Sequence, residues 1–251
     1  MPPELEHSHH PSDIQHRLAG DYEVSYLRDS ILGGIDGCVT TIAVVASVAG
    51  AGLPGVVAFV LGIASLVADA LSMGVSNYQA VKSDDDARER LRNQEKRHIE
   101  ADPEGEREEI RQIFQIKGLE GEVLEQVVDT ITSDRRLWVD TMIQEEFGHS
   151  LQGPSPWRAG VTTFLMFLVV GAVPLVPFLM PFFVGHEYFI ASFAFAALAL
   201  FAIGWAKGVI LQMNRWRAGL ETLLMGGSAS AVAFLFGYFL EPMLADLNNS
   251  F

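Results

Sequence analysis

Five apolar segments of about 20 residues or more constrain the fold of this chain more than any other feature. The hydrocarbon core of a bilayer is about 30 Å thick, and an α-helix needs about 20 predominantly apolar residues to cross it. The sequence therefore predicts an all-α membrane protein with five transmembrane helices. The predicted spans are Ile31–Gly50, Gly55–Val81, Ala159–Met180, Phe189–Leu211 and Leu220–Leu240.

Charge is segregated along the sequence in step with these segments. Residues 31–81 hold only two charged side chains, Asp36 and Asp69, whereas residues 82–152 hold 19 acidic and 11 basic ones. The net charge of −14 argues against nucleic acid as a partner. The expected division is a polar, histidine-containing tail (1–26), spans one and two (27–81), an acidic helical domain (82–152), spans three to five (153–241) and a C-terminal tail (242–251).

The acidic block contains recognisable helix boundaries. The second span is expected to continue as a charged helix to about Glu100. Asp102-Pro103 is typical of a helix start and predicts a helix at Pro103–Ile116. Further helices are expected at about Glu120–Thr132 and from Ser133 or Asp134 to near Gly148.

The positions of lysine and arginine indicate how the spans are oriented, because cytoplasmic loops carry an excess of both. All 17 of these side chains lie in residues 1–30, 82–158 and 207–217. Five spans place these three regions on the same side of the membrane. The N-terminus and the acidic domain are therefore expected in the cytoplasm, and the C-terminus outside.

Two carboxylates lie within predicted spans. An ionisable group inside a membrane helix is costly and is by default a functional hypothesis. Asp36 lies in the first span and Asp69 in the second, where Met73 follows one helical turn later. A thioether beside a carboxylate suits a transition metal. The alternative is that neighbouring hydroxyls such as Thr40 and Ser65 satisfy both carboxylates and that Met73 only fills space.

The acidic domain holds a second set of candidate ligands, paired at helical spacing so that each pair shares one face. Convergence of these pairs gives oxygen, nitrogen and sulfur ligands, a mixture that fits Fe²⁺ or a similar first-row ion. The alternative is a solvated acidic surface with Arg92, Lys96, Arg107 and Arg111 as ion-pair partners. The candidate ligands are Glu95, His98, Glu106, Glu109, Met142, Glu146 and the adjacent Glu145.

Several motifs carry a family resemblance. The stretch 32–41 (LGGIDGCVTT), which contains Asp36, resembles the first-helix motif of the vacuolar iron transporter family. The stretch 70–74 (ALSMG) is similar to its second-helix motif, and 207–208 with 219–227 are similar to its last two helices. The resemblance covers about residues 24–240.

This resemblance implies a five-span homodimer that moves Fe²⁺, and often Mn²⁺, out of the cytosol in exchange for protons. By position, it assigns ion binding and proton coupling to Asp36 and the transport path to Met73. It assigns metal capture to five positions in the cytoplasmic domain. It also implies no permanently bound cofactor, because the metal is the substrate. The five capture positions are Glu95, Glu106, Glu109, Met142 and Glu146.

The chain departs from the family pattern at three positions. Ser65 stands where some members carry glutamate, and Asp69, one turn later, is a possible substitute. Asn77 stands where many members carry an acidic residue. His98 stands where glutamate is expected, and its imidazole favours Zn²⁺ or Fe²⁺ over Mn²⁺.

A second functional hypothesis is a membrane-anchored, ferritin-like di-iron oxidase. Both Glu95-x-x-His98 and Glu146-x-x-His149 fit the Glu-x-x-His motif of such sites. Residues 1–30 lack the apolar core of a signal peptide, and the lack of an obvious targeting extension favours a prokaryotic plasma membrane.

Overall fold

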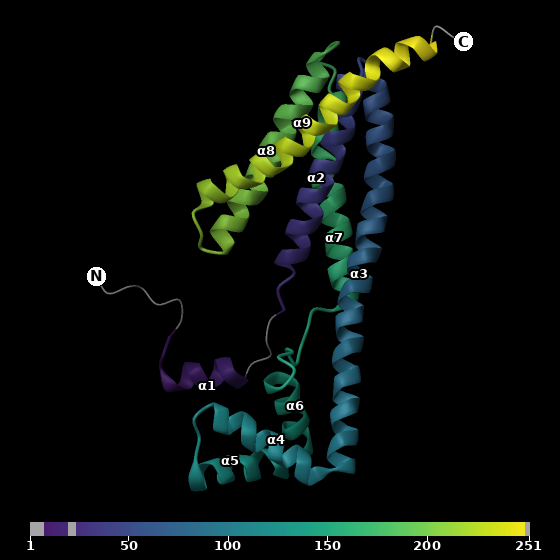
Figure 1. Ribbon diagram of the computed structural model, residues 1–251. Coiled ribbons are helices and arrows are strands. Elements are labelled where there is room, and N and C mark those ends of the chain that lie inside the picture. The colour runs from purple at the N-terminus through teal and green to yellow at the C-terminus, as the bar shows by residue number, and fades with distance from the viewer. Residues whose placement is uncertain (1–7, 20–23, 249–251) are drawn as a thin grey trace.

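The computed structural model describes residues 8–19 and 24–248, and every regular element within them is helical. Five helices are long and apolar enough to cross a membrane, as the sequence predicts. They form a bundle at one end of the molecule, while a smaller group of helices lies at the other end (Figure 1). The elements in chain order are α1 (Pro11–Ala19), α2 (Leu27–Gly50), α3 (Gly55–Ala101), α4 (Pro103–Ile116), α5 (Gly121–Ser133), α6 (Arg135–Glu145), α7 (Pro156–Gly171), the 3₁₀ helix η1 (Val173–Leu179), α8 (Glu187–Ile210) and α9 (Arg215–Asn248).

Helix α3 connects the two parts of the molecule. Its 47 residues extend over about 70 Å at 1.5 Å per residue, more than twice the thickness of a bilayer core. The first half packs in the bundle, and the second half carries charged residues to α4, α5 and α6 (Figure 1). The prediction that the second span continues as a charged helix is therefore confirmed. We call α4, α5, α6 and the last turns of α3 the distal group.

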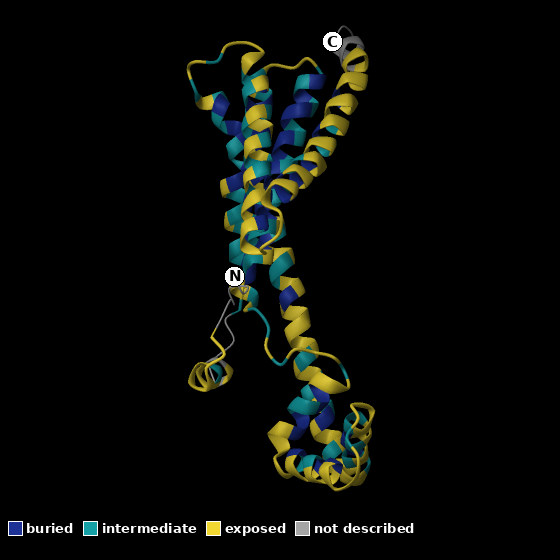
Figure 2. Cartoon of the chain, turned by 90° about the vertical axis from the view of Figure 1, so that its left-hand side faces the viewer, coloured by how far each residue is buried: buried dark blue, intermediate teal, exposed yellow. Residues whose placement is uncertain are grey.

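Helix α2 is the centre of the bundle and contacts α3, α7, α8 and α9. Small residues allow this close packing. A Cβ atom added at Gly37 of α2 would lie 2.4 Å from the carbonyl oxygen of Phe167 in α7, so no larger side chain fits there. Buried residues concentrate along the inner faces of these helices, whereas the outer faces of the bundle are exposed (Figure 2). Because the exposed residues of α9 are mostly apolar, as Leu224 and Phe239 are, that face suits a lipid environment.

The third span changes its helix type near its end. Helix α7 ends at Gly171, and the segment Val173–Leu179 forms a 3₁₀ helix. Pro174 and Pro177 cause this change, because proline has no amide hydrogen to donate to the preceding turn. The predicted span, about Ala159–Met180, therefore agrees with the observed one, Pro156–Leu179, whose last turns are 3₁₀ helix.

Other predicted boundaries differ by smaller amounts. Helix α9 continues through Pro242 to Asn248, beyond the predicted end of the fifth span. Helix α6 ends at Glu145, earlier than expected, and the chain turns at Gly148, where φ is +65°. The polar N-terminal segment contains the short helix α1. Of its histidines, His7 lies outside the described residues.

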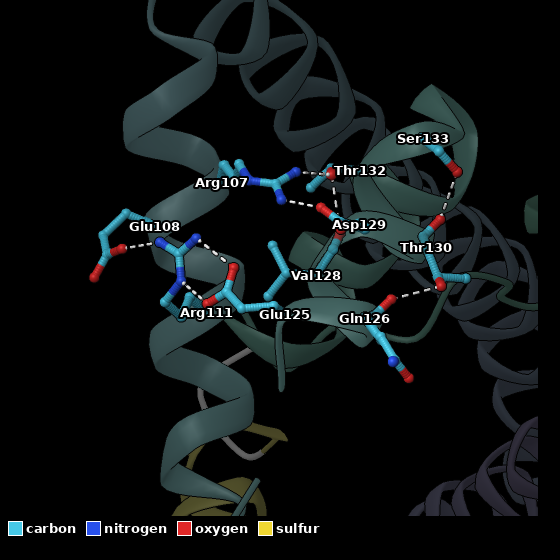
Figure 3. Close-up of polar contacts among 10 residues, drawn as sticks. All are labelled: Arg107, Glu108, Arg111, Glu125, Gln126, Val128, Asp129, Thr130, Thr132 and Ser133. Carbon is cyan, nitrogen blue, oxygen red and sulfur yellow. Dashed lines mark hydrogen bonds and ion pairs between the residues drawn. The ribbon is translucent and has the colours of Figure 1, made fainter. Parts of the chain in front are cut away.

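The distal group has its own apolar core and a layer of ion pairs around it. Ile110, Val128 and Trp138 are buried in this core. On the outside, Arg107 of α4 reaches Asp129 and Thr132 of α5, and Arg111 of α4 donates to Glu125 of α5 at 2.6 Å (Figure 3). These contacts fix α4 against α5.

Candidate metal sites

The turn between α3 and α4 brings two sets of candidate ligands together. Asp102 is the N-cap of α4, and its carboxylate accepts a hydrogen bond from the Gly105 amide at 3.0 Å. Pro103 occupies the first helical position, where its missing amide hydrogen is not needed. The chain therefore turns sharply, and the first turn of α4 lies beside the last turns of α3 (Figure 1).

Glu95 and His98 of α3 meet Glu106 of α4 across this turn. The His98 Nδ1 atom lies 3.3 Å from Glu106 Oε1 and 3.8 Å from Glu95 Oε1. One ligand atom from each residue falls within 4.8 Å of the other two. We call this trio the Glu95–His98–Glu106 cluster. Two carboxylates and one imidazole suit a divalent first-row metal ion.

The carboxylates of the cluster are buried, and three of their four oxygens have no hydrogen-bond partner among the described residues. Glu95 is 1% exposed and Glu106 is 6% exposed. Among the described residues, neither oxygen of Glu95 nor Oε2 of Glu106 has a hydrogen-bond partner. A buried, unpaired carboxylate is costly and rare in native structures unless an ion or water completes it. The arrangement therefore fits a cation-binding site better than a structural role.

The charges of Glu109 and Glu146 act on the same cluster. Burial raises the pKa of Glu106 to about 7, and repulsion by Glu109 and then by Glu95 adds to the effect. Burial and then repulsion by Glu146 raise the pKa of Glu95, whereas burial and then repulsion by Glu109 raise that of Glu146. Mutual repulsion in a confined site is what a bound cation would relieve.

Three nearby arginines are engaged elsewhere. Arg92 donates to Asp140 at 2.5 Å, while Arg107 and Arg111 bind acids of α5 and the exposed Glu108. The alternative that arginine partners neutralise the candidate ligands is therefore wrong for Glu95 and Glu106.

Two predicted ligands make their contacts outside the cluster. Glu145 forms an ion pair with Lys117, so the structure does not place it in the cluster. Met142 is fully buried in the apolar core beside Ile110, and packing accounts for its position. Its role as a sulfur ligand stays a prediction.

The second Glu-x-x-His motif does not form a di-iron half-site. Glu146 is the C-cap of α6, and His149 follows the turn at Gly148. The two side chains therefore do not share a helical face, and Glu106 and Glu109 lie on one helix instead of two. The described residues thus lack the pair of Glu-x-x-His helices that ferritin-like sites use.

Within the bundle, the structure brings Asp36 and Asp69 near each other. Their charges interact, and the Thr40 hydroxyl hydrogen-bonds to the Asp36 carboxylate. The Ser65 hydroxyl donates to Asp69 at 2.6 Å. The predicted hydroxyl partners are therefore present, and the two carboxylates are close enough for their charges to interact. Met73, one turn after Asp69, is half-buried and packs against the bundle core.

Asp36 also faces an open hollow of about 650 Å³. All residues that line this hollow belong to one face of α2. No second helix among the described residues lines the hollow. The Asp36 side chain is therefore open on this side to whatever surrounds the bundle. The lining residues are Arg28, Ile31, Leu32, Ile35, Asp36 and Val39.

A third carboxylate, Asp29, was not predicted from the sequence. It is 5% exposed and accepts a hydrogen bond at 2.8 Å from the Asn77 amide, which also donates to the Thr163 hydroxyl at 2.7 Å. This network joins α2, α3 and α7. Asn77, which the family resemblance marked as a missing carboxylate, thus supplies an amide to a carboxylate on the neighbouring helix. The seven-residue spacing from Asp29 to Asp36, two helical turns, was the available signal.

Comparison with known proteins adds independent findings. The VIT family profile matches residues 27–238. The chain is 35% identical to vacuolar iron transporter 1 of Tulipa gesneriana, over 83% of this chain and 84% of that one. It is 32% identical to vacuolar iron transporter 1 of Arabidopsis thaliana, over 88% and 86%. It is 29% identical to the vacuolar iron transporter of Toxoplasma gondii, over 92% and 82%. The names of these relatives refer to the vacuole, so the expectation of a prokaryotic plasma membrane finds no support here.

Proposed function

The chain belongs to the VIT family, and from this premise we propose that it exports Fe²⁺ from the cytosol in exchange for protons. The observation that carries the proposal is the Glu95–His98–Glu106 cluster, in which three of the four buried carboxylate oxygens have no hydrogen-bond partner among the described residues. The family match and the named iron transporters among the relatives support a metal ion as the substrate.

The distal group captures the ion. Glu95 and Glu106 supply buried carboxylate ligands, and His98 supplies a nitrogen ligand. Glu109 and Glu146 add negative charge that attracts the cation. Met142 is the proposed sulfur ligand, reached by a small shift of the core around it.

The bundle then passes the ion across the membrane. Asp36, Asp69 and Met73 form the proposed transport path between α2 and α3. A proton that binds Asp36 from the outside neutralises the carboxylate and releases the cation. Loss of that proton to the cytosol restores the site. Asp69 takes the place of the carboxylate that Ser65 lacks, and the hydrogen bond between them orients it.

A second copy of the chain covers the open face of α2. An aspartate on a lipid-facing surface is costly, and the hollow lined by Arg28, Asp36 and Val39 has only one wall among the described residues. A homodimer with α2 at its interface supplies the second wall. The N-terminus and the distal group lie in the cytoplasm and the C-terminus outside, as the distribution of lysine and arginine indicates.

The ligand set also suggests an order of preference among ions. Imidazole binds Zn²⁺ and Fe²⁺ more strongly than Mn²⁺. With His98 in place of a carboxylate, Fe²⁺ and Zn²⁺ are the favoured ions at the cluster and Mn²⁺ is a weaker one.

Uptake of Fe²⁺ into proteoliposomes under a proton gradient tests the transport proposal. Asp36→Asn keeps the size of the side chain but removes its charge and its proton, so we expect uptake to fall to the level of empty liposomes. Asp84→Asn, which alters an exposed carboxylate on the second half of α3, is the matched control and should retain uptake. Wild-type uptake by Asp36→Asn, or uptake that ignores the proton gradient, would refute the mechanism.

The oxidase alternative has a separate test. A di-iron oxidase consumes oxygen when Fe²⁺ is added. We expect the full-length protein to bind Fe²⁺ without oxygen consumption above that of Fe²⁺ in buffer. Stoichiometric consumption that Glu95→Gln abolishes would favour the enzyme over the transporter.

A further inference from the structure

The turn between α8 and α9 is a rigid structure at the end of the bundle. Gln212 adopts a left-handed conformation with φ of +53°, and the Met213 amide donates back to the Gly208 carbonyl at 2.8 Å. This is a Schellman-type helix end. Asn214 then caps α9 by accepting hydrogen bonds from the amides of Trp216 and Arg217. Hydrogen bonds therefore define the course of the backbone through the turn.

Three cations lie within the ends of α8 and α9, which cross closely at this turn. A Cβ atom added at Gly208 would lie 2.7 Å from the Arg215 Cα atom, so the end of α8 touches the start of α9. This contact places the Arg215 guanidinium 5.7 Å from the centre of the Trp205 ring. Lys207 lies one residue before Gly208, and Arg217 two residues after Arg215. We call Lys207, Arg215 and Arg217 with Trp205 and Trp216 the α8–α9 basic turn.

These three cations lack acidic partners. Among the described residues, no carboxylate forms an ion pair with Lys207, Arg215 or Arg217, although Glu221 follows in the same helix. In the distal group, by contrast, most arginines pair with an acid, as Arg92 and Arg107 do. In a chain with a net charge of −14, three unpaired cations at one turn indicate an anionic partner from outside the chain.

The neighbouring side chains place that partner at a membrane surface. Trp216 is 64% exposed, and its ring packs 5.9 Å from that of Phe201. Trp205 is 37% exposed, and Val209, one helical turn after it, is exposed as well. Tryptophan is enriched at the level of lipid headgroups, with its ring toward the acyl chains. A soluble anion would gain nothing from these apolar surfaces, whereas a lipid would contact them with its chains.

We propose that the α8–α9 basic turn binds the phosphate headgroup of an anionic phospholipid. The cations contact the phosphate and the headgroup charge, while Trp205, Trp216 and the exposed apolar residues contact the glycerol and acyl region. Each lysine or arginine near an anionic surface contributes about 1 kcal/mol, which corresponds to about a fivefold change in affinity. The proposal does not depend on which ion the protein carries.

Tryptophan fluorescence tests the proposal in the full-length protein. Trp138→Phe and Trp157→Phe together leave Trp205 and Trp216 as the reporters. The protein is placed in phosphatidylcholine vesicles that contain either brominated phosphatidylglycerol or the same mole fraction of brominated phosphatidylcholine, since bromine quenches nearby indole. We expect markedly stronger quenching by the anionic lipid, because the turn enriches it above its bulk fraction.

Variants identify the residues responsible. Lys207→Gln, Arg215→Gln and Arg217→Gln combined should reduce the excess quenching by the anionic lipid to near zero. The matched control replaces three exposed cations of the acidic region. It should keep the excess quenching by the anionic lipid. It combines Arg90→Gln, Arg97→Gln and Arg136→Gln.

Three results would overturn the assignment. Equal quenching by the two lipids in the reporter protein would show that the turn does not select an anionic lipid, and this comparison stands even if the triple variant fails to fold. If the folded triple variant keeps the excess quenching by the anionic lipid, residues other than these three cations select that lipid. Loss of the excess on addition of inorganic phosphate to the solution would assign the turn to soluble phosphate instead of lipid.

Discussion

Replacement of Glu106 by glutamine is expected to stabilise the metal-free distal group at neutral pH while weakening metal capture. The Glu106 side chain is almost fully buried, and one of its oxygens has no hydrogen-bond partner among the described residues. Burial, with repulsion by Glu109 and Glu95, raises its pKa from 4.5 to about 7. The wild-type protein thus keeps at this position a carboxylate that is costly to ionise.

The magnitude follows from linkage between protonation and folding. A carboxyl group whose pKa is higher in the folded state stabilises that state fully below pH 4.5, and the contribution is lost as the pH rises through about 7. At about 1.36 kcal/mol for each pKa unit, the rise to about 7 corresponds to a loss of about 3 kcal/mol on ionisation. Glutamine is neutral at every pH, so Glu106→Gln avoids this loss.

Hydrogen exchange of the full-length, metal-free protein measures the effect. After correction for the intrinsic exchange rate, wild-type amides of α4 and α6 should lose protection between about pH 5 and about pH 8, by up to about 3 kcal/mol. The Glu106→Gln variant should lose much less. Added Fe²⁺ should restore protection in the wild type but not in the variant, because the variant lacks one anionic ligand.

Glu104→Gln is the control, since this residue lies in the same helix with an exposed side chain. It should behave like the wild type. If Glu106→Gln loses as much protection as the wild type over the same pH range, the ionisation of Glu106 is not the source of the instability, and the argument from its burial fails.

Three further predictions concern other parts of the chain. His98→Glu should lower the preference for Zn²⁺ over Mn²⁺ by roughly tenfold in equilibrium metal binding, because it replaces nitrogen by oxygen, and an unchanged ratio would exclude His98 as a ligand. Gly37→Ala should destabilise the bundle by about 1–3 kcal/mol in thermal unfolding, because its Cβ atom would meet the Phe167 carbonyl. Gly227→Ala, whose Cβ atom meets nothing within 4 Å, should instead stabilise by up to about 1 kcal/mol, because alanine is the better helix former. Gln212→Gly should raise stability by about 1 kcal/mol, because glycine adopts the left-handed conformation without strain, and an equal gain from Gln212→Ala would contradict this reason.

The helices of the distal group show how far local sequence signals extend. The pair Asp102-Pro103 predicted the start of α4, and the observed helix Pro103–Ile116 matches the predicted one. Capping and the φ of proline depend on a few adjacent residues, so they can be recognised without the fold. The third span shows the limit of length and apolarity as signals. Its apolar run continued to Met180, but Pro174 and Pro177 changed the hydrogen bonding before the run ended.

Partner choice among charged side chains was not predictable in the same way. The sequence offered Arg92, Arg107 and Arg111 as possible partners for the candidate ligands. The structure pairs them with Asp140, Asp129, Glu125 and Glu108, and so leaves Glu95 and Glu106 without a basic partner among these arginines. Likewise, the hydrogen bond between Asn77 and Asp29 joins residues 48 positions apart. Such contacts depend on how helices pack, which periodicity along one helix does not reveal.

The sequence alone determined the five spans, the charged extension of α3 and the positions of the candidate ligands. Each of these depends on the length of an apolar run, on local capping or on spacing along one helix, and all of these are properties of neighbouring residues. The tertiary structure decided which ligands converge, which buried carboxylates have no arginine or lysine partner among the described residues and which face of α2 stays open beside Asp36. The reason is that burial and pairing arise where helices from distant parts of the chain meet, and only there does a carboxylate lose its water and require a cation in its place.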